Sequence, residues 1–314
     1  MEKKNSRLAM WALIPAFLLC FAVRLVQILA GTDMNTGFMY DDCGFLLKYG
    51  YYGLLIITAG ALIALVILDT KRGCAISDAD SARFVDGRAV MAAFPMLVMG
   101  ALTVYEGVVE MRAITPSALL IFTDFVLGGI VTLVAFITLY KKEFNRFLGF
   151  SYVAGALLFM VRLMCYFMDQ MAVASIPERL IKCLAPIFAT VFFMQLAKLL
   201  CGAQQKKTAA SLVVIGGTGA VLILSSALAT IVAGLIAPSD IASRITSDSY
   251  KAELFKQVSF GKNYYMMQWM SWVDVLFAVM AVLVIVVLYM RPAEKKISAD
   301  EEAPEENSSD LDEN

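Results

Sequence analysis

Residues 210–235 read ASLVVIGGTGAVLILSSALATIVAGL, a run without a single Asp, Glu, Lys or Arg. About 20 mostly apolar residues are enough for an α-helix to cross the hydrocarbon core of a bilayer. The run therefore predicts a transmembrane helix. Its glycines at 216, 217 and 219 favour close packing against neighbouring helices, because small residues let two backbones approach each other.

Seven other stretches share this apolar character. We predict eight transmembrane helices, over residues 8–30, 45–69, 89–111, 117–140, 147–169, 179–201, 210–235 and 268–290. The composition agrees, since hydrophobic residues make up 60% of the chain and charged residues 17%, whereas soluble domains have about a quarter charged. The predicted fold class is an all-α polytopic membrane protein, with the lipid bilayer as its main partner.

The distribution of Lys and Arg predicts the orientation of these helices. With the N-terminus inside, sixteen of these residues fall in cytoplasmic segments and eight in outer segments, while Arg24 and Arg162 lie within helices. Short cytoplasmic loops are enriched in Lys and Arg. We therefore expect a multi-pass protein of the plasma membrane with both termini cytoplasmic.

Charged residues recur at matching positions in the first four and the last four predicted helices. The pairs are Arg24 and Arg162, Lys48 and Lys182, and Asp124 and Asp274. The residues around the arginines also match, as FAVRL at 21–25 and FMVRL at 159–163. Because charge is rare in such helices, this predicts a tandem repeat of four helices, with units 1–146 and 147–290. Each unit has an even number of helices, so the units would share one orientation, as in parallel-repeat transporters.

Two segments outside the predicted spans have patterns of their own. In the long outer loop 236–267, Tyr250, Leu254 and Val258 recur at helical spacing, which predicts a short amphipathic helix on the membrane surface or capping the bundle. Residues 291–314 are rich in Asp, Glu, Ser and Pro. This composition predicts a disordered cytoplasmic tail, which is either simply solvated or a contact for a protein partner.

Ionisable residues inside the predicted helices form the candidate polar site. The deeper ones lie five to seven residues from the outer ends of their helices: Arg24, Glu106, Asp124, Arg162 and Asp274. Shallower, peripheral positions on the same side are Lys48, Glu110 and Lys182. The deeper set lies roughly 8–10 Å from the helix ends, at about 1.5 Å per residue. The inner halves of the helices carry no deep charge. Each such residue costs about 2.5–3.5 kcal/mol to insert, so we expect the set to face the bundle interior or water.

Two interpretations of this set remain open. The functional one is an outward-facing polar cavity between the two repeats, which binds a small polar or charged solute or relays protons. Glu106 would break the symmetry of this cavity, because the corresponding part of the seventh helix carries Ser225 and Ser226. In the alternative, the charges are structural ion pairs in a non-transporting sensor, scaffold or accessory subunit, and Lys48 and Lys182 reach the membrane interface on their flexible stems.

The composition argues against several other functions. The chain has no histidine and no C-x-x-C among its six cysteines, which removes the usual metal-ligand sets and the histidine-dependent nucleophiles. No phosphate-cradling glycine loop or other catalytic motif is present. The net charge of −1 offers no basic face for nucleic acid. We therefore expect no metal, no cofactor, no nucleic-acid partner and no enzymatic activity.

The segment GTDMNTGF at 31–38, which follows Arg24, resembles a recurrent element of uncharacterised multi-pass bacterial membrane proteins. The resemblance covers the first helix and the loop after it. It implies a membrane location and no particular activity. The same small polar residues are also typical of an ordered turn.

Overall fold

The computed structural model describes residues 7–31, 43–71, 90–111, 118–141, 152–170, 177–201, 208–236 and 271–289. Within these ranges it contains eight α-helices: α1 (Leu8–Gly31), α2 (Phe45–Lys71), α4 (Val90–Glu110), α5 (Ala118–Lys141), α7 (Val153–Gln170), α8 (Pro177–Leu200), α9 (Thr208–Ile236) and α13 (Trp272–Tyr289). Each predicted span overlaps one of these helices. The all-α fold is confirmed.

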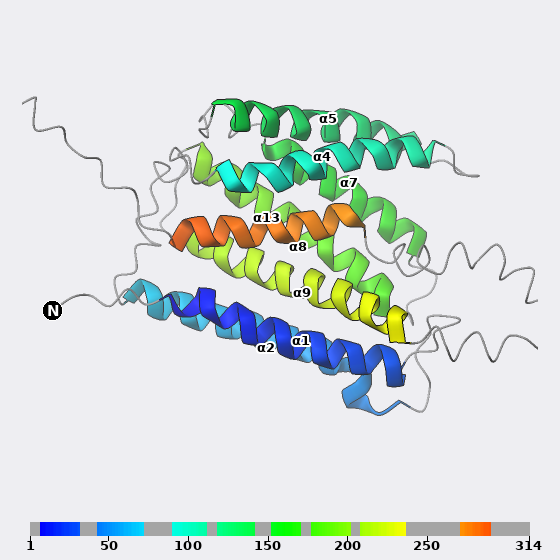
Figure 1. The fold of residues 1–314 in the computed structure, drawn as a ribbon, viewed down its shortest axis with the longest axis vertical. Coiled ribbons are helices and arrows are strands. Elements are labelled where there is room, and N and C mark those ends of the chain that lie inside the picture. Colours follow the sequence, from blue (N-terminus) through cyan, green and yellow to red (C-terminus); the bar gives the residue numbers. More distant parts are fainter. Residues whose placement is uncertain are drawn as a thin grey trace, which may run out of the picture.

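Seven of the described helices are long and apolar enough to cross a membrane. A helix satisfies its own backbone hydrogen bonds, which is what allows it to span hydrocarbon. The chain is therefore a multi-pass membrane protein, as predicted. The exception is α7, whose apolar stretch Val153–Met168 is shorter. It nevertheless lies between α5 and α8 and runs alongside them (Figure 1), and its crossing of the membrane stays a prediction.

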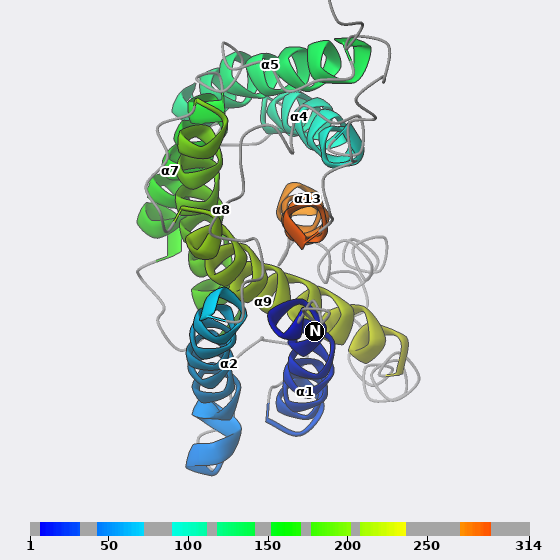
Figure 2. The ribbon, with the colours of Figure 1, turned by 90° about the vertical axis from the view of Figure 1, so that its left-hand side faces the viewer.

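The helices lie roughly side by side, and α9 lies between α8 and the α1–α2 pair (Figure 1). Helix α9 packs against α1, α2, α8 and α13. Seen from the end, α9, α8, α7, α5, α4 and α13 follow one another around a ring (Figure 2). The α1–α2 hairpin packs on the outside of this ring, against α9.

The packing does not divide the helices into the two predicted sets of four. Helices α1 and α2 pack on α9 of the second set. Helix α4 packs on α13, and α5 packs on α7, both also of the second set. The tandem repeat and its boundaries, 1–146 and 147–290, therefore stay predictions from the sequence. Most of the outer loop 236–267, including Tyr250, Leu254 and Val258, lies outside the described residues, as does the tail 291–314.

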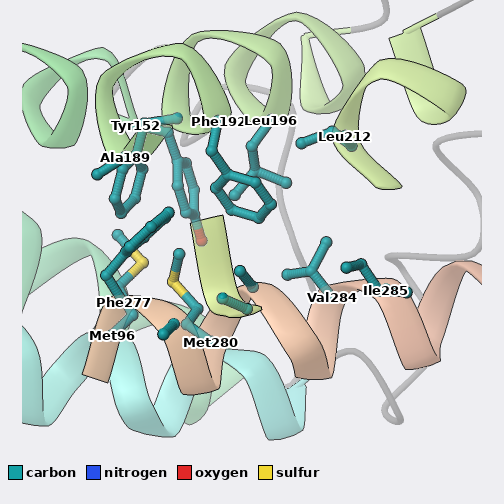
Figure 3. Close-up of a cluster of buried hydrophobic side chains, with 14 of the residues drawn as sticks. Met96, Tyr152, Ala189, Phe192, Leu196, Leu212, Phe277, Met280, Val284 and Ile285 are labelled. Carbon is teal, nitrogen blue, oxygen red and sulfur yellow. The ribbon is translucent and has the colours of Figure 1, made fainter. Parts of the chain in front are cut away.

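A buried aromatic cluster fills the interior between α7, α8 and α13. Phe277 of α13 lies with its ring centroid 5.7 Å from Phe159, 5.5 Å from Phe192 and 6.2 Å from Phe193, all within the range of favourable aromatic pairs. Figure 3 shows Phe192 and Phe277 beside other buried side chains, including Met96 of α4. The four phenylalanines Phe159, Phe192, Phe193 and Phe277 are called the aromatic layer below.

Helices α4 and α5 approach each other unusually closely because glycines line their contact. A Cβ added at Gly100 would lie 2.7 Å from the backbone nitrogen of Thr132, and one at Gly107 would lie 3.2 Å from the Cβ of Asp124. A backbone atom cannot move aside as a side chain can, so only glycine fits at Gly100 without a shift of the helices. This approach brings Glu106, the neighbour of Gly107, next to Asp124.

Candidate functional site

Arg162 of α7 is the centre of a buried ionic network. Its side chain is 1% exposed. The guanidinium donates from Nε and Nη2 to Oδ1 of Asp124 on α5, at 3.2 and 3.0 Å, and from Nη2 to Oε2 of Glu106 on α4, at 2.7 Å. Both contacts are ion pairs. Hydrogen bonds between charged groups are about twice as strong as neutral ones, so the network ties α4, α5 and α7 together.

Glu106 extends the network to the first turn of α13. Its Oε1 accepts a hydrogen bond of 2.7 Å from the hydroxyl of Ser271. The same hydroxyl oxygen accepts from the N–H of Val273 at 3.1 Å, and the Ser271 carbonyl accepts from the N–H of Asp274 at 3.0 Å. Ser271 therefore caps the α13 N-terminus. Glu106 is also the most exposed of the three ion-paired residues, since a third of its side chain (33%) is exposed.

A third carboxyl group, that of Asp274, lies beside the network in the first turn of α13. It is 2% exposed and interacts electrostatically with Arg162, Glu106 and Lys182. The ammonium of Lys182 on α8 lies 4.7 Å from the centroid of the Tyr166 ring, a cation–π distance. Tyr166 is one helical turn from Arg162. Glu106, Asp124, Arg162, Asp274, Lys182 and Tyr166 are called the Arg162 cluster below.

The aromatic layer begins one helical turn from this cluster. Phe277 follows Asp274 by three residues on α13, and Phe159 precedes Arg162 by three residues on α7. Three residues correspond to about 4.5 Å along a helix. The cluster therefore has an apolar floor on its side facing the middle of the helices.

The structure places Arg24 at a different helix interface, between α1, α2 and α9. Its side chain is fully buried and donates a hydrogen bond from Nη1 to Oε1 of Gln27. Its guanidinium carbon lies 5.5 Å from the ring centroid of Tyr51. The Tyr51 hydroxyl in turn contacts α9, donating to the Leu222 carbonyl at 2.9 Å and sharing a hydrogen bond of 3.0 Å with Ser225.

The deeper predicted residues thus fall into two groups rather than one. Glu106, Asp124, Arg162 and Asp274 come together, and Arg24 lies apart from them. Among the peripheral residues, Lys182 belongs to the Arg162 cluster, and Glu110 interacts electrostatically with Asp124. The backbone carbonyl of Lys48 accepts a hydrogen bond of 3.1 Å from Gln27, on the Arg24 side.

Asp69, near the end of α2, is a buried carboxylate that sequence reasoning missed. It is fully buried. Its oxygens accept hydrogen bonds from the backbone N–H groups of Leu8 and Ala9, at 3.4 and 3.1 Å, and from the hydroxyl of Tyr289, at 3.1 Å. It thereby joins the N-terminus of α1 and the C-termini of α2 and α13. The sequence feature that could have indicated Asp69 is its negative charge at a helix end where the neighbouring charged residues, Lys71 and Arg72, are basic.

The fold and the site together define an all-α polytopic membrane protein with a buried ionic cluster shared by α4, α5, α7, α8 and α13. No family model, curated protein or solved structure matches the chain. The resemblance of residues 31–38 therefore adds nothing beyond the membrane location. The function has to be argued from the cluster itself.

Proposed function

We propose that the protein is a small-solute transporter, or a membrane-embedded binding protein, whose polar site is the Arg162 cluster. The observation that supports this is the gathering of three carboxyl groups, from α4, α5 and α13, around one buried arginine. Ionisable residues inside membrane proteins are costly and generally mark solute, ion or proton pathways. Glu106, the partly exposed member, would be the first group that a solute meets.

The aromatic layer fits a site that is closed on one side. The rings of Phe159, Phe192, Phe193 and Phe277 pack against one another directly below the cluster. A charged solute cannot cross such a layer without water or polar partners. In a transporter, passage would therefore require α13 to separate from α7 and α8. In a binding protein, the layer would stay closed.

The tandem repeat belongs to this proposal as well. It would relate the α1–α2 hairpin to α7 and α8, each pair with a buried arginine in its first helix, Arg24 or Arg162. Arg162 pairs with the carboxylates of Asp124 and Glu106, and Arg24 contacts Gln27 and Tyr51.

A sensor, scaffold or accessory subunit is the second candidate. The ion pairs of Arg162, at 2.7 and 3.0 Å, also suit a purely structural tie between helices. The two candidates predict different behaviour when the charges of a pair are exchanged. The exchange restores a structural tie but misplaces the groups that would recognise a solute.

The test uses the purified full-length protein and a panel of small cationic, anionic and zwitterionic solutes. We expect at least one solute class to raise the thermal unfolding midpoint of the wild type, and to be taken up or bound by vesicles that contain it. The single variant Arg162→Asp should be unstable, and the double variant Arg162→Asp with Asp124→Arg should regain stability without regaining the solute effect. If the double variant regains both, or no solute class acts on the wild type, the scaffold is the better explanation.

A further inference from the structure

The three carboxyl groups of the Arg162 cluster differ in their hydrogen-bond partners. Asp124 accepts two N–H groups of Arg162, and Glu106 accepts one from Arg162 and one from Ser271. For the carboxyl group of Asp274, the described residues provide no hydrogen-bond donor and no ion-pair partner, although its side chain is 2% exposed. Asp274 is therefore the one buried acid of the cluster whose carboxyl group receives no hydrogen bond from the described residues.

A second unpartnered group belongs to the same cluster. Nη1 of Arg162 is buried and has no hydrogen-bond acceptor among the described residues, although Nε and Nη2 of the same guanidinium are fully engaged. An N–H donor and a carboxyl group are natural partners, and both are left unpaired in one electrostatic neighbourhood. A buried polar group without a partner costs about 1–3 kcal/mol, so this arrangement calls for an explanation.

The other charged groups around Asp274 do not remove its need for a partner. Glu106 on α4 is negative, and Arg162 on α7 already has two carboxylate partners. Lys182 on α8 places its ammonium over the Tyr166 ring of α7. Helix α9 has no titratable side chain, and Arg24 and Cys20 of α1 interact with Tyr51 instead. An aspartate in such a place avoids the large cost of a buried charge by binding a proton.

We propose that Asp274 is a proton-binding site that exchanges its proton for an ion pair with Arg162. With the proton bound, Asp274 is a neutral carboxylic acid and Nη1 of Arg162 stays free, as in the structure. When the proton leaves to water, the resulting carboxylate attracts Nη1, and α13 moves relative to α7. This proposal deepens the proposed function, because it names the proton as the ion that the solute site would bind and release. It rests on the proposed function, since only a transporter or binding protein would use such an exchange.

A proton fits this site better than a metal cation does. A sodium or calcium ion requires several oxygen ligands arranged around it. In the described part of the chain no group of three or more Asp, Glu, Cys or His side chains is placed to hold a metal ion. A single carboxyl group is sufficient for a proton.

The test is infrared difference spectroscopy of the full-length protein in lipid vesicles, between neutral and alkaline pH. We expect the carbonyl stretch of a protonated carboxylic acid at neutral pH, lost as the pH rises. The band should be absent in Asp274→Asn and shifted in Asp274→Glu. Asp69→Asn is the matched control, because Asp69 is equally buried but accepts hydrogen bonds from Leu8, Ala9 and Tyr289. That variant should keep the band.

A wild-type spectrum without a protonated carboxylic acid would overturn the proposal. So would a band that persists in Asp274→Asn or disappears in Asp69→Asn. If Asp274→Asn does not fold, the Asp274→Glu shift alone decides the assignment, and an unshifted band counts against it. A band that behaves as expected in a protein that neither binds nor transports any solute would support the proton site and overturn the proposed function, so the two can fail separately.

Discussion

At one end of α13, the buried carboxylate of Asp69 accepts hydrogen bonds from Leu8, Ala9 and Tyr289, whereas at the other end the buried carboxyl group of Asp274 accepts none from the described residues. Both side chains are almost completely hidden. Burial alone therefore does not distinguish these two acids. The number of donors that each carboxyl group receives is the more informative property.

At the Asp69 end, hydrogen bonds hold the ends of α1, α2 and α13 together. Leu8 and Ala9 are the first residues of α1, and the first four N–H groups of a helix have no partner within the helix. A carboxylate there also interacts favourably with the positive end of the helix dipole. Among the described residues, the Asp274 end instead combines a carboxyl group that receives no hydrogen bond with a buried Nη1 of Arg162 that has no acceptor. We infer that α13 is anchored at Tyr289 and is free to change its contacts near Ser271.

The largest effect is expected from removing the cation at the Asp274 end. Arg162→Ala leaves the carboxylates of Asp124 and Glu106 without their ion-pair partner. Breaking one partner of a buried pair costs about 3–5 kcal/mol. We expect a large fall in the free energy of unfolding, measured by denaturant titration in mixed micelles.

The control for this prediction is Arg162→Ala combined with Asp124→Asn and Glu106→Gln. This triple variant has lost the cation and both of its partner charges, so it should be more stable than Arg162→Ala alone. If the single and triple variants are equally stable, the ion pairs contribute little, and the contrast between the two ends of α13 weakens.

The second prediction concerns the Asp69 end of α13. Asp69→Ala removes the acceptor of two backbone N–H groups and of the Tyr289 hydroxyl. Hydrogen bonds to charged groups contribute about 1.5–3 kcal/mol each, and the lost donors would be buried. We expect a fall in the free energy of unfolding of about this size or more, together with faster amide hydrogen exchange at the start of α1.

Tyr289→Phe is the matched variant, since it removes the Tyr289 hydroxyl donor and leaves Leu8 and Ala9 bonded to Asp69. It should cost about 1.5–3 kcal/mol, the contribution of one hydrogen bond to a charged group, and leave amide exchange in α1 unchanged. Equal effects of the two variants would mean that Asp69 serves α13 alone and does not join it to α1.

The sequence was sufficient to predict the helices, because the length and hydropathy of a transmembrane segment are local properties. It also identified Arg162, Asp124, Asp274 and Glu106 as unusual, because charge in an apolar helix is rare. It could not show that Arg24 lies apart from them. Which helices become neighbours depends on how side chains pack over the whole bundle, and the repeat pattern suggested a symmetry that these helix contacts do not display.

Asp69 escaped prediction for a related reason. An acidic residue at the end of a predicted span usually lies in the polar interface of the membrane. Its burial comes from the N-terminus of α1 and from Tyr289, which is 220 residues away in the chain. Likewise, no local pattern distinguishes Asp274 from Asp124. The difference lies in how Arg162 distributes its N–H groups between them.

The third prediction concerns the helix contact that positions Glu106. Gly100→Ala would place a Cβ 2.7 Å from the backbone nitrogen of Thr132, so α4 and α5 must move apart. Overpacking of this kind costs about 1–3 kcal/mol. Glu106 is on α4 and Asp124 on α5, so the movement would also separate these two carboxyl groups. We therefore expect solutes to raise the thermal unfolding midpoint less than in the wild type, while amide exchange near Asp69 stays unchanged.

Gly129→Ala on α5 is the control, since an added Cβ there meets nothing within 4 Å. Alanine has the higher helix propensity, by about 1 kcal/mol, so this variant should be at least as stable as the wild type. A Gly100→Ala variant as stable as Gly129→Ala would show that the two helices can separate without cost.

The smallest effect is expected from Asp274→Asn, and this variant gives the most direct comparison of the two ends of α13. If Asp274 carries a proton at neutral pH, asparagine replaces one neutral group by another of nearly the same shape. The free energy of unfolding should then change by less than about 1 kcal/mol, since no hydrogen bond of the described structure is lost. Asp69→Asn, the same chemical change at the other end, should be clearly more destabilising because it replaces an oxygen acceptor by an amide N–H group where Leu8, Ala9 and Tyr289 donate hydrogen bonds.

The pH dependence of the same pair of variants separates the explanations further. A neutral Asp274 must lose its proton as the pH rises, and the wild type should then become less stable than Asp274→Asn unless the new carboxylate reaches Nη1 of Arg162. A wild type that keeps its stability into alkaline pH, while its infrared band disappears, would show that the ion pair with Arg162 has formed. If instead Asp274→Asn is as destabilising as Asp69→Asn at neutral pH, Asp274 is a charged structural acid like Asp69, and the distinction drawn between the two ends of α13 does not hold.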